Sequence, residues 1–371
     1  MKVGTVTEIK KHEYRVGLTP KSAKAFIDHG HSVYIQKGAG EGSGYGDEMY
    51  GQAGCILLDR AKDVFDICDM IVKVKEPLEP EYGLIRENQI IYTYLHLAAD
   101  KALTDTMLES RCIGIAFETI RDRSGGLPCL KPMSQIAGRL SVQEGAKYLE
   151  KPFGGRGVLL SGVPGVGRGK VVVLGAGIVG TSAIKIAAGM GADVTVLDIN
   201  LNRLEYLEDL YQGKINTVYS TPQHIQECLG DADLVIGAVL IPGAAAPKLI
   251  KREYLKNMKK GAVIVDVAID QGGCSEASHV TYHDDPVYVT DGVVCYCVGN
   301  MPGAVSNTST NALNNAILNY GLSIADKGAE RALLEDTGLL EGLNTYKGKL
   351  TYQAVAEVYG RAYTDARTAI L

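Results

Sequence analysis

The chain has 371 residues, more than a single hydrophobic core usually holds, so we expect two domains. Its net charge of −5, without any Lys/Arg-rich stripe, argues against nucleic-acid binding. The amino terminus is too charged for a signal peptide and no apolar run reaches membrane-spanning length, which predicts a cytoplasmic protein without a membrane partner.

The first part of the chain alternates short apolar runs with helical patterns. In "TPKSAKAFIDHG", Thr19 can cap a helix, Pro20 fits its first turn and Gly30 can end it. Buried runs that alternate with helices are typical of parallel sheets built from strand–helix–strand units. Strands are predicted here at residues 2–7, 32–36, 70–74, 89–95 and 112–117.

Two interruptions divide the chain. Gly, Pro and Ser concentrate at residues 123–138, where a helix is expected to begin at Ser134, and "NMPGAVSNTSTNAL" precedes long helical patterns that reach the carboxyl terminus. We therefore predict an α/β fold of two Rossmann-like domains, each a mainly parallel sheet flanked by helices, with an interdomain cleft. Residues 129–305 would be inserted between residues 1–128 and 306–371. Strands of the inserted part are predicted at residues 170–174, 193–197, 217–220, 233–238, 262–267 and 287–289.

The eight cysteines show no C-x-x-C and no metal-ligand spacing, so we expect packed free thiols and no metal site. Cys295 and Cys297 lie two apart in the apparent strand "GVVCYCVG", which places them on one face.

A nucleotide-binding motif opens the inserted domain. "KVVVLGAGIVG" runs from a buried-type strand into Gly175-x-Gly177-x-x-Gly180 and then into an Ala-rich helix. The glycines allow a tight turn, close approach of the backbone to a diphosphate and close packing of helix on sheet. The diphosphate would lie at the helix amino terminus, where N–H groups and the dipole favour negative charge.

The next strand, "DVTVLD", ends in Asp198, 23 residues after Gly175. An acid at this place can accept hydrogen bonds from the ribose 2′-OH and would repel a 2′-phosphate, which favours NAD over NADP. Arg203 is close and keeps NADP open. The alternative is a glycine-rich turn that binds no nucleotide.

Four residues could carry chemistry near a nicotinamide. His96 follows the strand in "IIYTYLH", where period-two alternation places it with Tyr92 and Tyr94, and an imidazole can give and take a proton near neutrality. A hydrogen-bonded loop histidine is the alternative. Lys75 ends "MIVKVKEP" and could hold a carboxylate or polarise a carbonyl; Lys73 is expected on an exposed strand surface.

The other two candidates lie in loops. Arg15, in "KHEYRVGLTP", could grip a carboxylate with two parallel hydrogen bonds, or could be a surface residue. Asp270 closes "GAVIVDVAIDQGG" and could orient water or ammonia, or could serve as a turn or capping acid. Asp266 is a second acid near the end of this strand.

These stretches together resemble the NAD-dependent alanine dehydrogenase family. The resemblance covers the whole chain through "EYRVGLTP", "VKVKEP", "TYLHLA", "LGAGIVG", "VDVAIDQGG", "DPVYVTDGVV" and "NMPGAV" followed by "TST". It implies interconversion of L-alanine with pyruvate and ammonia, and a cytoplasmic homohexamer. It also implies that residues 1–128 and 306–371 form the substrate domain and residues 129–305 the NAD-binding domain.

The resemblance assigns roles residue by residue. It makes His96 the general acid/base, Asp270 the second catalytic acid, and Arg15 and Lys75 the substrate-carboxylate ligands. The residues it places at NAD are Ser134, Gly175, Gly177, Ile178, Val179, Gly180, Asp198, Arg203, Ser220, Val239, Leu240, Val267, Asp270, Val298, Asn300 and Met301.

The chain departs from the family pattern at two places. His279 stands where an arginine is usual, and Ser306–Asn307 replace a typical Pro-Arg or Pro-Lys, which puts adenosine affinity and hinge behaviour in question. Three alternatives stay open: an NAD(H)-binding transhydrogenase-type subunit, a saccharopine or lysine dehydrogenase, and a non-catalytic NAD(H) sensor. Neither the first nor the last requires His96.

Overall fold

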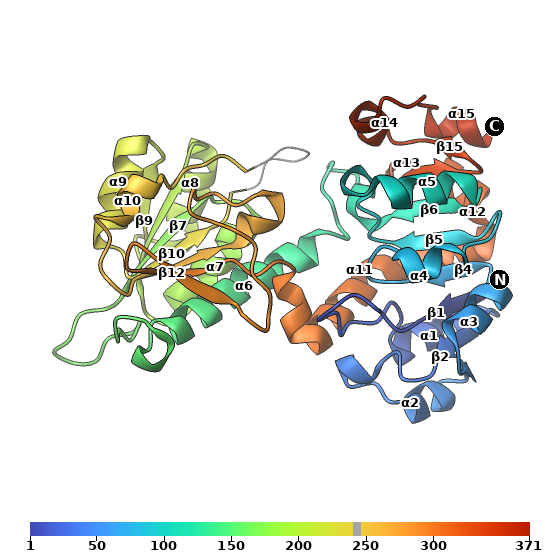
Figure 1. Ribbon diagram of the computed structural model, residues 1–371, viewed down its shortest axis with the longest axis horizontal. Coiled ribbons are helices and arrows are strands. Elements are labelled where there is room, and N and C mark those ends of the chain that lie inside the picture. The colour runs from blue at the N-terminus through green and yellow to red at the C-terminus, as the bar shows by residue number, and fades with distance from the viewer. Residues whose placement is uncertain (240–245) are drawn as a thin grey trace. The chain divides into compact units, whose positions relative to one another are not determined.

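The computed structural model describes residues 1–239 and 246–371, which fall into two compact units (Figure 1). Unit 1 comprises residues 1–133 and 305–371, and unit 2 comprises residues 134–304. Each unit holds one mainly parallel sheet between helices, which confirms the predicted α/β fold class.

Unit 1 contains an eight-stranded sheet in the order β15-β14-β6-β5-β4-β1-β2-β3. All neighbours are parallel except β14, which is antiparallel to both β6 and β15. The strands are β1 (Lys2–Thr5), β2 (Ser32–Gln36), β3 (Ile56–Leu58), β4 (Met70–Val72), β5 (Ile90–Thr93), β6 (Ile113–Ala116), β14 (Leu343–Tyr346) and β15 (Lys349–Leu350).

Helices cover both faces of this sheet. Apolar side chains of α3, α5 and α14 form one core with the strands, and α4 and α5 lie in front of the sheet in Figure 1. On the other face Tyr92 of β5 donates its hydroxyl to the Ile317 carbonyl of α11 at 3.0 Å. The helices are α1 (Pro20–Asp28), α2 (Asp47–Gln52), α3 (Ala61–Ile67), α4 (Glu79–Tyr82), α5 (Lys101–Glu109), α11 (Ser306–Lys327), α12 (Ala329–Glu335), α13 (Thr337–Leu340), α14 (Gln353–Tyr359) and α15 (Ala366–Ile370).

The start of α1 follows the predicted capping pattern. The Thr19 hydroxyl accepts the Ser22 N–H at 3.1 Å, Pro20 opens the helix, and Gly30 adopts a left-handed backbone just after its end.

Unit 2 contains a seven-stranded sheet in the order β12-β13-β11-β10-β7-β8-β9. Read from β9, this is the 3-2-1-4-5-6 order of dinucleotide-binding folds, with β12 added antiparallel at the far edge. The strands are β7 (Lys170–Leu174), β8 (Asp193–Asp198), β9 (Asn216–Tyr219), β10 (Leu234–Gly237), β11 (Val263–Asp266), β12 (Val287–Thr290) and β13 (Val293–Tyr296).

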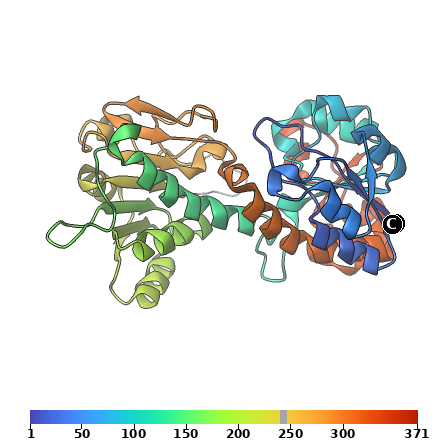
Figure 2. The same ribbon diagram turned by 90° about the horizontal axis from the view of Figure 1, so that it is seen from below.

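The helices of unit 2 are α6 (Lys131–Tyr148), α7 (Ile178–Gly189), α8 (Leu201–Tyr211), α9 (Pro222–Asp231) and α10 (Arg252–Leu255). Helices α9 and α10 share one apolar core with β7, β10 and β11. Helices α6 and α7 run side by side (Figure 2), and a Cβ added at Gly138 of α6 would stand 2.2 Å from the Val179 carbonyl oxygen of α7. Glycine at this crossing lets the two backbones touch.

The structure corrects several details of the prediction. Helix α6 begins at Lys131, three residues before the expected Ser134, and β4 and β5 each end two residues early. The short strands β3, β14 and β15 were not predicted. Cys295 and Cys297 do share one small apolar cluster, and all eight cysteines are free. In the described part of the chain, no helix has the length and apolarity to cross a bilayer.

Candidate functional site

Three of the four chemical candidates follow neighbouring strands of unit 1. Arg15 lies between β1 and α1, Lys75 lies after β4, and His96 lies after β5. Because β5, β4 and β1 are adjacent and parallel, their carboxyl ends meet at one edge of the sheet. The topology thus brings these three segments to the edge where α/β proteins bind ligands.

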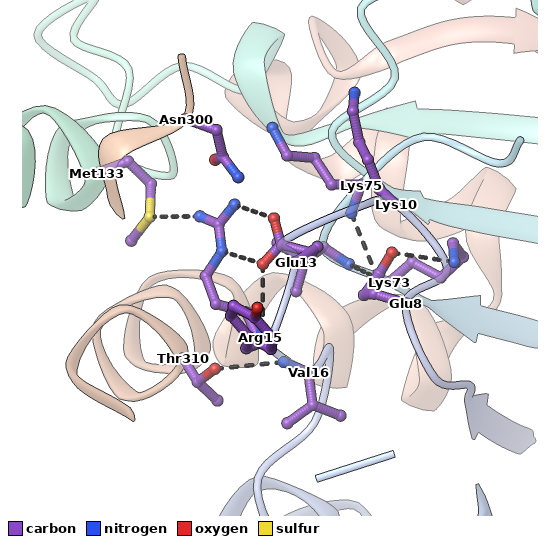
Figure 3. Close-up of polar contacts among 12 residues, drawn as sticks. Glu8, Lys10, Glu13, Arg15, Val16, Lys73, Lys75, Met133, Asn300 and Thr310 are labelled. Carbon is purple, nitrogen blue, oxygen red and sulfur yellow. Dashed lines mark hydrogen bonds and ion pairs between the residues drawn. The ribbon is translucent and has the colours of Figure 1, made fainter. Parts of the chain in front are cut away.

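Arg15 is buried, with 2% of its surface exposed, so the surface-residue alternative is wrong. Its Nε and Nη2 donate to the two carboxylate oxygens of Glu13, both at 2.6 Å, and its Nη1 lies 3.1 Å from Met133 Sδ (Figure 3). Burial opposes the guanidinium charge, but the Glu13 carboxylate outweighs it and raises the pKa of Arg15. Arg15 therefore remains a cation, and its two hydrogen bonds to the Glu13 carboxylate fix the orientation of the guanidinium.

The carboxy-terminal part of the chain holds the Arg15 segment in place. From α11, Thr310 accepts the Val16 N–H at 3.2 Å and Asn314 accepts the Thr19 N–H at 2.8 Å. Helix α11 thus fixes the backbone that follows Arg15.

The alternation of Lys73 with Lys75 predicted that Lys73 lies on an exposed strand surface. This prediction is wrong. The Lys73 side chain is 0% exposed, and its Nζ lies 3.1 Å from Glu8 Oε2 and 2.8 Å from Glu81 Oε1. The alternation failed because β4 ends at Val72, before either lysine. Burial opposes the ammonium charge, but the two carboxylates raise the pKa of Lys73, so its role is a buried ion pair.

Lys75 is only partly buried and lies beside a fixed backbone. Glu8 Oε1 accepts the Val74 N–H at 2.6 Å and the Lys75 N–H at 3.3 Å. Burial and then the nearby Arg15 cation lower the pKa of Lys75, whereas burial raises the pKa of Glu8. An anion bound between two cations that repel each other would relieve this repulsion, so this pair suits a carboxylate.

The predicted strand does not reach His96, so period-two alternation does not set the direction of its side chain. Strand β5 ends at Thr93, and His96 adopts φ 48° and ψ 38°, a left-handed backbone. The Glu118 carboxylate holds this turn by accepting the His96 N–H at 2.6 Å and the Leu95 N–H at 3.2 Å. The imidazole stacks on Tyr94 with centroids 5.9 Å apart, and its side chain stays 46% exposed.

Glu118 also faces the imidazole itself. Its Oε1 lies 3.8 Å from Nδ1 of His96, so a carboxylate stands beside one ring nitrogen. Glu8, Glu13 and Glu118 were not singled out from the sequence. The spacing of Glu13, two residues before Arg15, is the one local signal that could have indicated any of them.

In unit 2 the glycine-rich loop, residues 175–180, follows β7 directly. Gly175 has φ +101°, and a Cβ on Gly180 would stand 1.8 Å from the Gly175 carbonyl oxygen. Of the described residues, none comes within 4 Å of the place where a Cβ on Gly177 would stand. Gly177 caps α7, which begins at Ile178. The loop therefore combines close packing on one side with an open backbone at a helix amino terminus, which fits a dinucleotide diphosphate.

Asp198 ends β8 beside this loop. Its Oδ2 accepts the Ala176 N–H at 2.6 Å and its Oδ1 accepts the Asn200 N–H at 2.7 Å. The Arg203 guanidinium also meets the loop, donating from Nε and Nη2 to the Ala176 carbonyl at 3.2 and 3.0 Å.

Other predicted cofactor residues lie at the same sheet edge. Ser220 donates its N–H to the Asp198 carbonyl at 3.0 Å, and Val239 follows β10 next to Gly175. Ser134 lies in the first turn of α6, which begins three residues earlier than predicted. Leu240 lies outside the described residues.

Asp270 lies in a 3-10 turn after β11, from Val267 to Gln271, and is exposed. Its Oδ1 stands 3.2 Å from the place of a Cβ on Gly299, so it borders the predicted segment formed by Val298, Asn300 and Met301. Asp266 has a different function, because its fully buried carboxylate accepts the Cys274 N–H at 2.9 Å and the Ser278 hydroxyl at 2.6 Å. Asp266 is therefore a structural acid.

The two departures from the family pattern make local contacts. His279 stacks on Tyr288 at a centroid distance of 3.7 Å. The Ser306 hydroxyl donates to the Gly42 carbonyl and the Asn307 amide to the Ser43 carbonyl, both at 2.6 Å, which ties the start of α11 to an amino-terminal turn. Within residues 1–239 and 246–371, no cluster of His, Cys, Asp and Glu could hold a metal ion.

Comparison with known proteins covers both units. Residues 4–137 match the N-terminal domain, and residues 141–353 the C-terminal domain, described as alanine dehydrogenase/PNT. The chain is 53% identical to the alanine dehydrogenase of Methanococcus maripaludis and 52% identical to that of Halomonas elongata, over the whole of each chain.

Solved structures agree with these relatives. An L-alanine dehydrogenase structure that is 49% identical matches with a TM-score of 0.95, over 97% of this chain and 99% of that one. A transhydrogenase structure from Sinorhizobium meliloti, 23% identical, has a TM-score of 0.83 over 95% of this chain and 100% of that one, and shares the fold.

Proposed function

This chain belongs to the alanine dehydrogenase/PNT family, and we propose that it is an oxidoreductase that interconverts L-alanine, NAD⁺ and water with pyruvate, ammonia, NADH and a proton. The observation that carries this proposal is that two cations, the buried Arg15 and Lys75, lie near each other at the carboxyl ends of parallel strands. Two adjacent cations there provide what a small substrate carboxylate needs. Relatives named alanine dehydrogenase, identical at half of all positions, support the same substrate.

In this proposal unit 1 is the substrate domain and unit 2 the NAD-binding domain. The chemistry that bound NAD⁺ would supply is that of a hydride acceptor for the α-carbon of alanine. Gly177 and the first turn of α7 would hold the diphosphate, and Asp198 would accept a hydrogen bond from the ribose hydroxyl. A carboxylate at Asp198 favours NAD over a cofactor that carries a 2′-phosphate.

Arg15 and Lys75 would hold the substrate carboxylate and leave the α-carbon to face the nicotinamide. His96 would accept the proton of the alanine ammonium group before hydride transfer, and would return and accept protons as water adds to the imine and ammonia leaves. The His96 ring stacks on Tyr94 and lies beside the Glu118 carboxylate. It is exposed, so it can exchange these protons with water. Asp270 would position the water or the ammonia.

We further propose that the enzyme acts in the cytoplasm as a homohexamer. Sedimentation of the purified protein measures the assembly directly. A stable monomer would contradict this part of the proposal and leave the reaction untouched.

The reaction is tested by following NADH absorbance in parallel mixtures. We expect NADH to be oxidised in the mixture with pyruvate plus ammonium. We expect no oxidation of NADH with pyruvate alone or with an NADP-type acceptor. Oxidation by the NADP-type acceptor alone would indicate transhydrogenase chemistry. NADH binding without turnover in any mixture would indicate a sensor.

A further inference from the structure

One arginine in unit 2 has a more specific role than contact with a cofactor. The family pattern places Arg203 at NAD, and its charge next to Asp198 leaves open a 2′-phosphate ligand. The contacts of its guanidinium point elsewhere. Nε and Nη2 both donate to one carbonyl oxygen, that of Ala176, at 3.2 and 3.0 Å.

Ala176 is held at both of its backbone groups. Its N–H donates to Asp198 Oδ2 at 2.6 Å, and its carbonyl accepts from Arg203 and, at 3.2 Å, from the Thr181 hydroxyl. Arg203 Nη2 also donates to the Thr181 oxygen at 3.0 Å, which closes a small network around one carbonyl. The Ala176 side chain is fully buried, so this residue anchors the loop.

The direction of this carbonyl determines the direction of the next N–H. The peptide bond between Ala176 and Gly177 is trans, so its C=O and N–H point to opposite sides. With the carbonyl held against Arg203, the Gly177 N–H points away from Arg203. In the part of the chain that the structure describes, no group accepts this N–H, and the space beside Gly177 is open.

The guanidinium is itself held in position. Its Cζ lies 4.9 Å from the centre of the Tyr206 ring on the same helix, α8, and Arg203 is partly buried. A cation stacked on an aromatic face and bound to a carbonyl through two donors has lost most of its rotational freedom. To bind a 2′-phosphate through the paired Nε and Nη2 donors, Arg203 would have to release the Ala176 carbonyl.

We propose that Arg203 is a positioning residue that orients the Ala176–Gly177 peptide so that the Gly177 N–H faces the cofactor diphosphate, and that it is not a 2′-phosphate ligand. This inference rests on the proposed binding of NAD. A hydrogen bond to a charged donor contributes more than a neutral one, and here two come from one group. Without Arg203 the peptide can rotate, and the N–H is then lost to the diphosphate.

The test compares NADH and NADPH binding by fluorescence titration of the full-length protein. Arg203→Met should weaken both cofactors by about tenfold or more and by the same factor, because both carry the same diphosphate. Thr181→Val, which removes one donor to the same carbonyl without changing any charge, should weaken both by a few-fold. Lys185→Met removes an exposed cation from α7 and is the control for charge, with no change expected.

Two results would overturn the proposal: loss of NADPH binding alone in Arg203→Met, or unchanged NADH binding in both Arg203→Met and Thr181→Val. If Arg203→Met fails to fold, Arg203→Lys takes its place, because lysine keeps the charge and lacks the paired donors; unchanged NADH binding in Arg203→Lys would then overturn the proposal. The wild-type titration separates this inference from the proposed function. Absence of NADH binding by the wild type would contradict the function, whereas a normal wild-type titration with unaffected variants would contradict only the role of Arg203.

Discussion

The two units build their sites from different parts of the polypeptide. In unit 2 the site is mainly backbone: Gly175 turns the chain, Gly180 lets helix and strand touch, and Gly177 opens the helix amino terminus. In unit 1 the corresponding edge is built from buried charges, with Arg15 paired to Glu13 and Lys73 paired to two carboxylates. A backbone site depends on the absence of side chains, and a charged site depends on partners that stay together in the folded state.

This difference teaches where each site is vulnerable. Adding one methyl group at a tightly packed glycine should damage the first kind, and removing one member of a buried ion pair should damage the second. Chemistry and cofactor binding should also be separable by mutation. The following predictions test this contrast, beginning with the largest effect.

His96→Ala should lower kcat by about 10²- to 10⁴-fold, the usual contribution of a positioned acid/base, because the imidazole that would transfer the protons is removed. The NADH dissociation constant should stay within about twofold of wild type, since His96 belongs to unit 1. Stopped-flow turnover and fluorescence titration measure the two quantities. Near-normal turnover would refute the role of His96.

Lys73→Met should destabilise the protein by about 3–5 kcal/mol, because Glu8 and Glu81 would be left buried without their cation. Lys75→Met is the matched control, two residues away and partly accessible. It should leave the free energy of unfolding unchanged or slightly raised, because burial and Arg15 already oppose the Lys75 charge. Urea denaturation monitored by circular dichroism distinguishes the two; equal destabilisation would show that Lys73 has no special structural role.

Gly180→Ala should weaken NADH binding by at least tenfold, because the new methyl group would overlap the Gly175 carbonyl oxygen at 1.8 Å and displace the loop. Gly189→Ala, at the end of the same helix, is the control. No described residue lies within 4 Å of its added Cβ, and alanine favours a helix by about 0.5–1 kcal/mol over glycine, so binding should be retained with slightly raised stability. Retained binding in Gly180→Ala would contradict the packing account.

The affinity for pyruvate should fall in the alkaline range, by up to about tenfold per pH unit above the pKa of Lys75. That pKa is lowered by burial and by Arg15, so Lys75 loses its proton below the ordinary lysine value while Arg15, whose pKa is raised, stays charged. Below the lowered pKa both cations are present and affinity should be independent of pH. The pyruvate KM measured against pH at saturating NADH and ammonium checks the trend. Lys75→Arg should remove it.

The sequence allowed reliable prediction where the pattern is local. The glycine spacing after β7 and the cap of α1 needed no knowledge of distant residues, and both have the expected geometry. The strands β14 and β15 were missed because they pair antiparallel and lie outside the alternation of strands and helices from which the parallel strands were predicted.

The charged partners in unit 1 were not predictable in the same way. Glu8 accepts the backbone N–H of Val74, and Glu118 accepts the backbone N–H of His96. These hydrogen bonds exist only after the strands have assembled. Lys73 was misplaced for a related reason, since alternation has meaning only while the strand continues. Buried ion pairs thus require the tertiary structure before they can be assigned.

The most direct test of the central claim is one pair of titrations on Lys75→Met. If unit 1 binds the carboxylate and unit 2 binds the dinucleotide, the pyruvate KM should rise by about tenfold or more while the NADH dissociation constant stays as in wild type. An unchanged pyruvate KM, or a parallel loss of NADH binding, would contradict this division of roles.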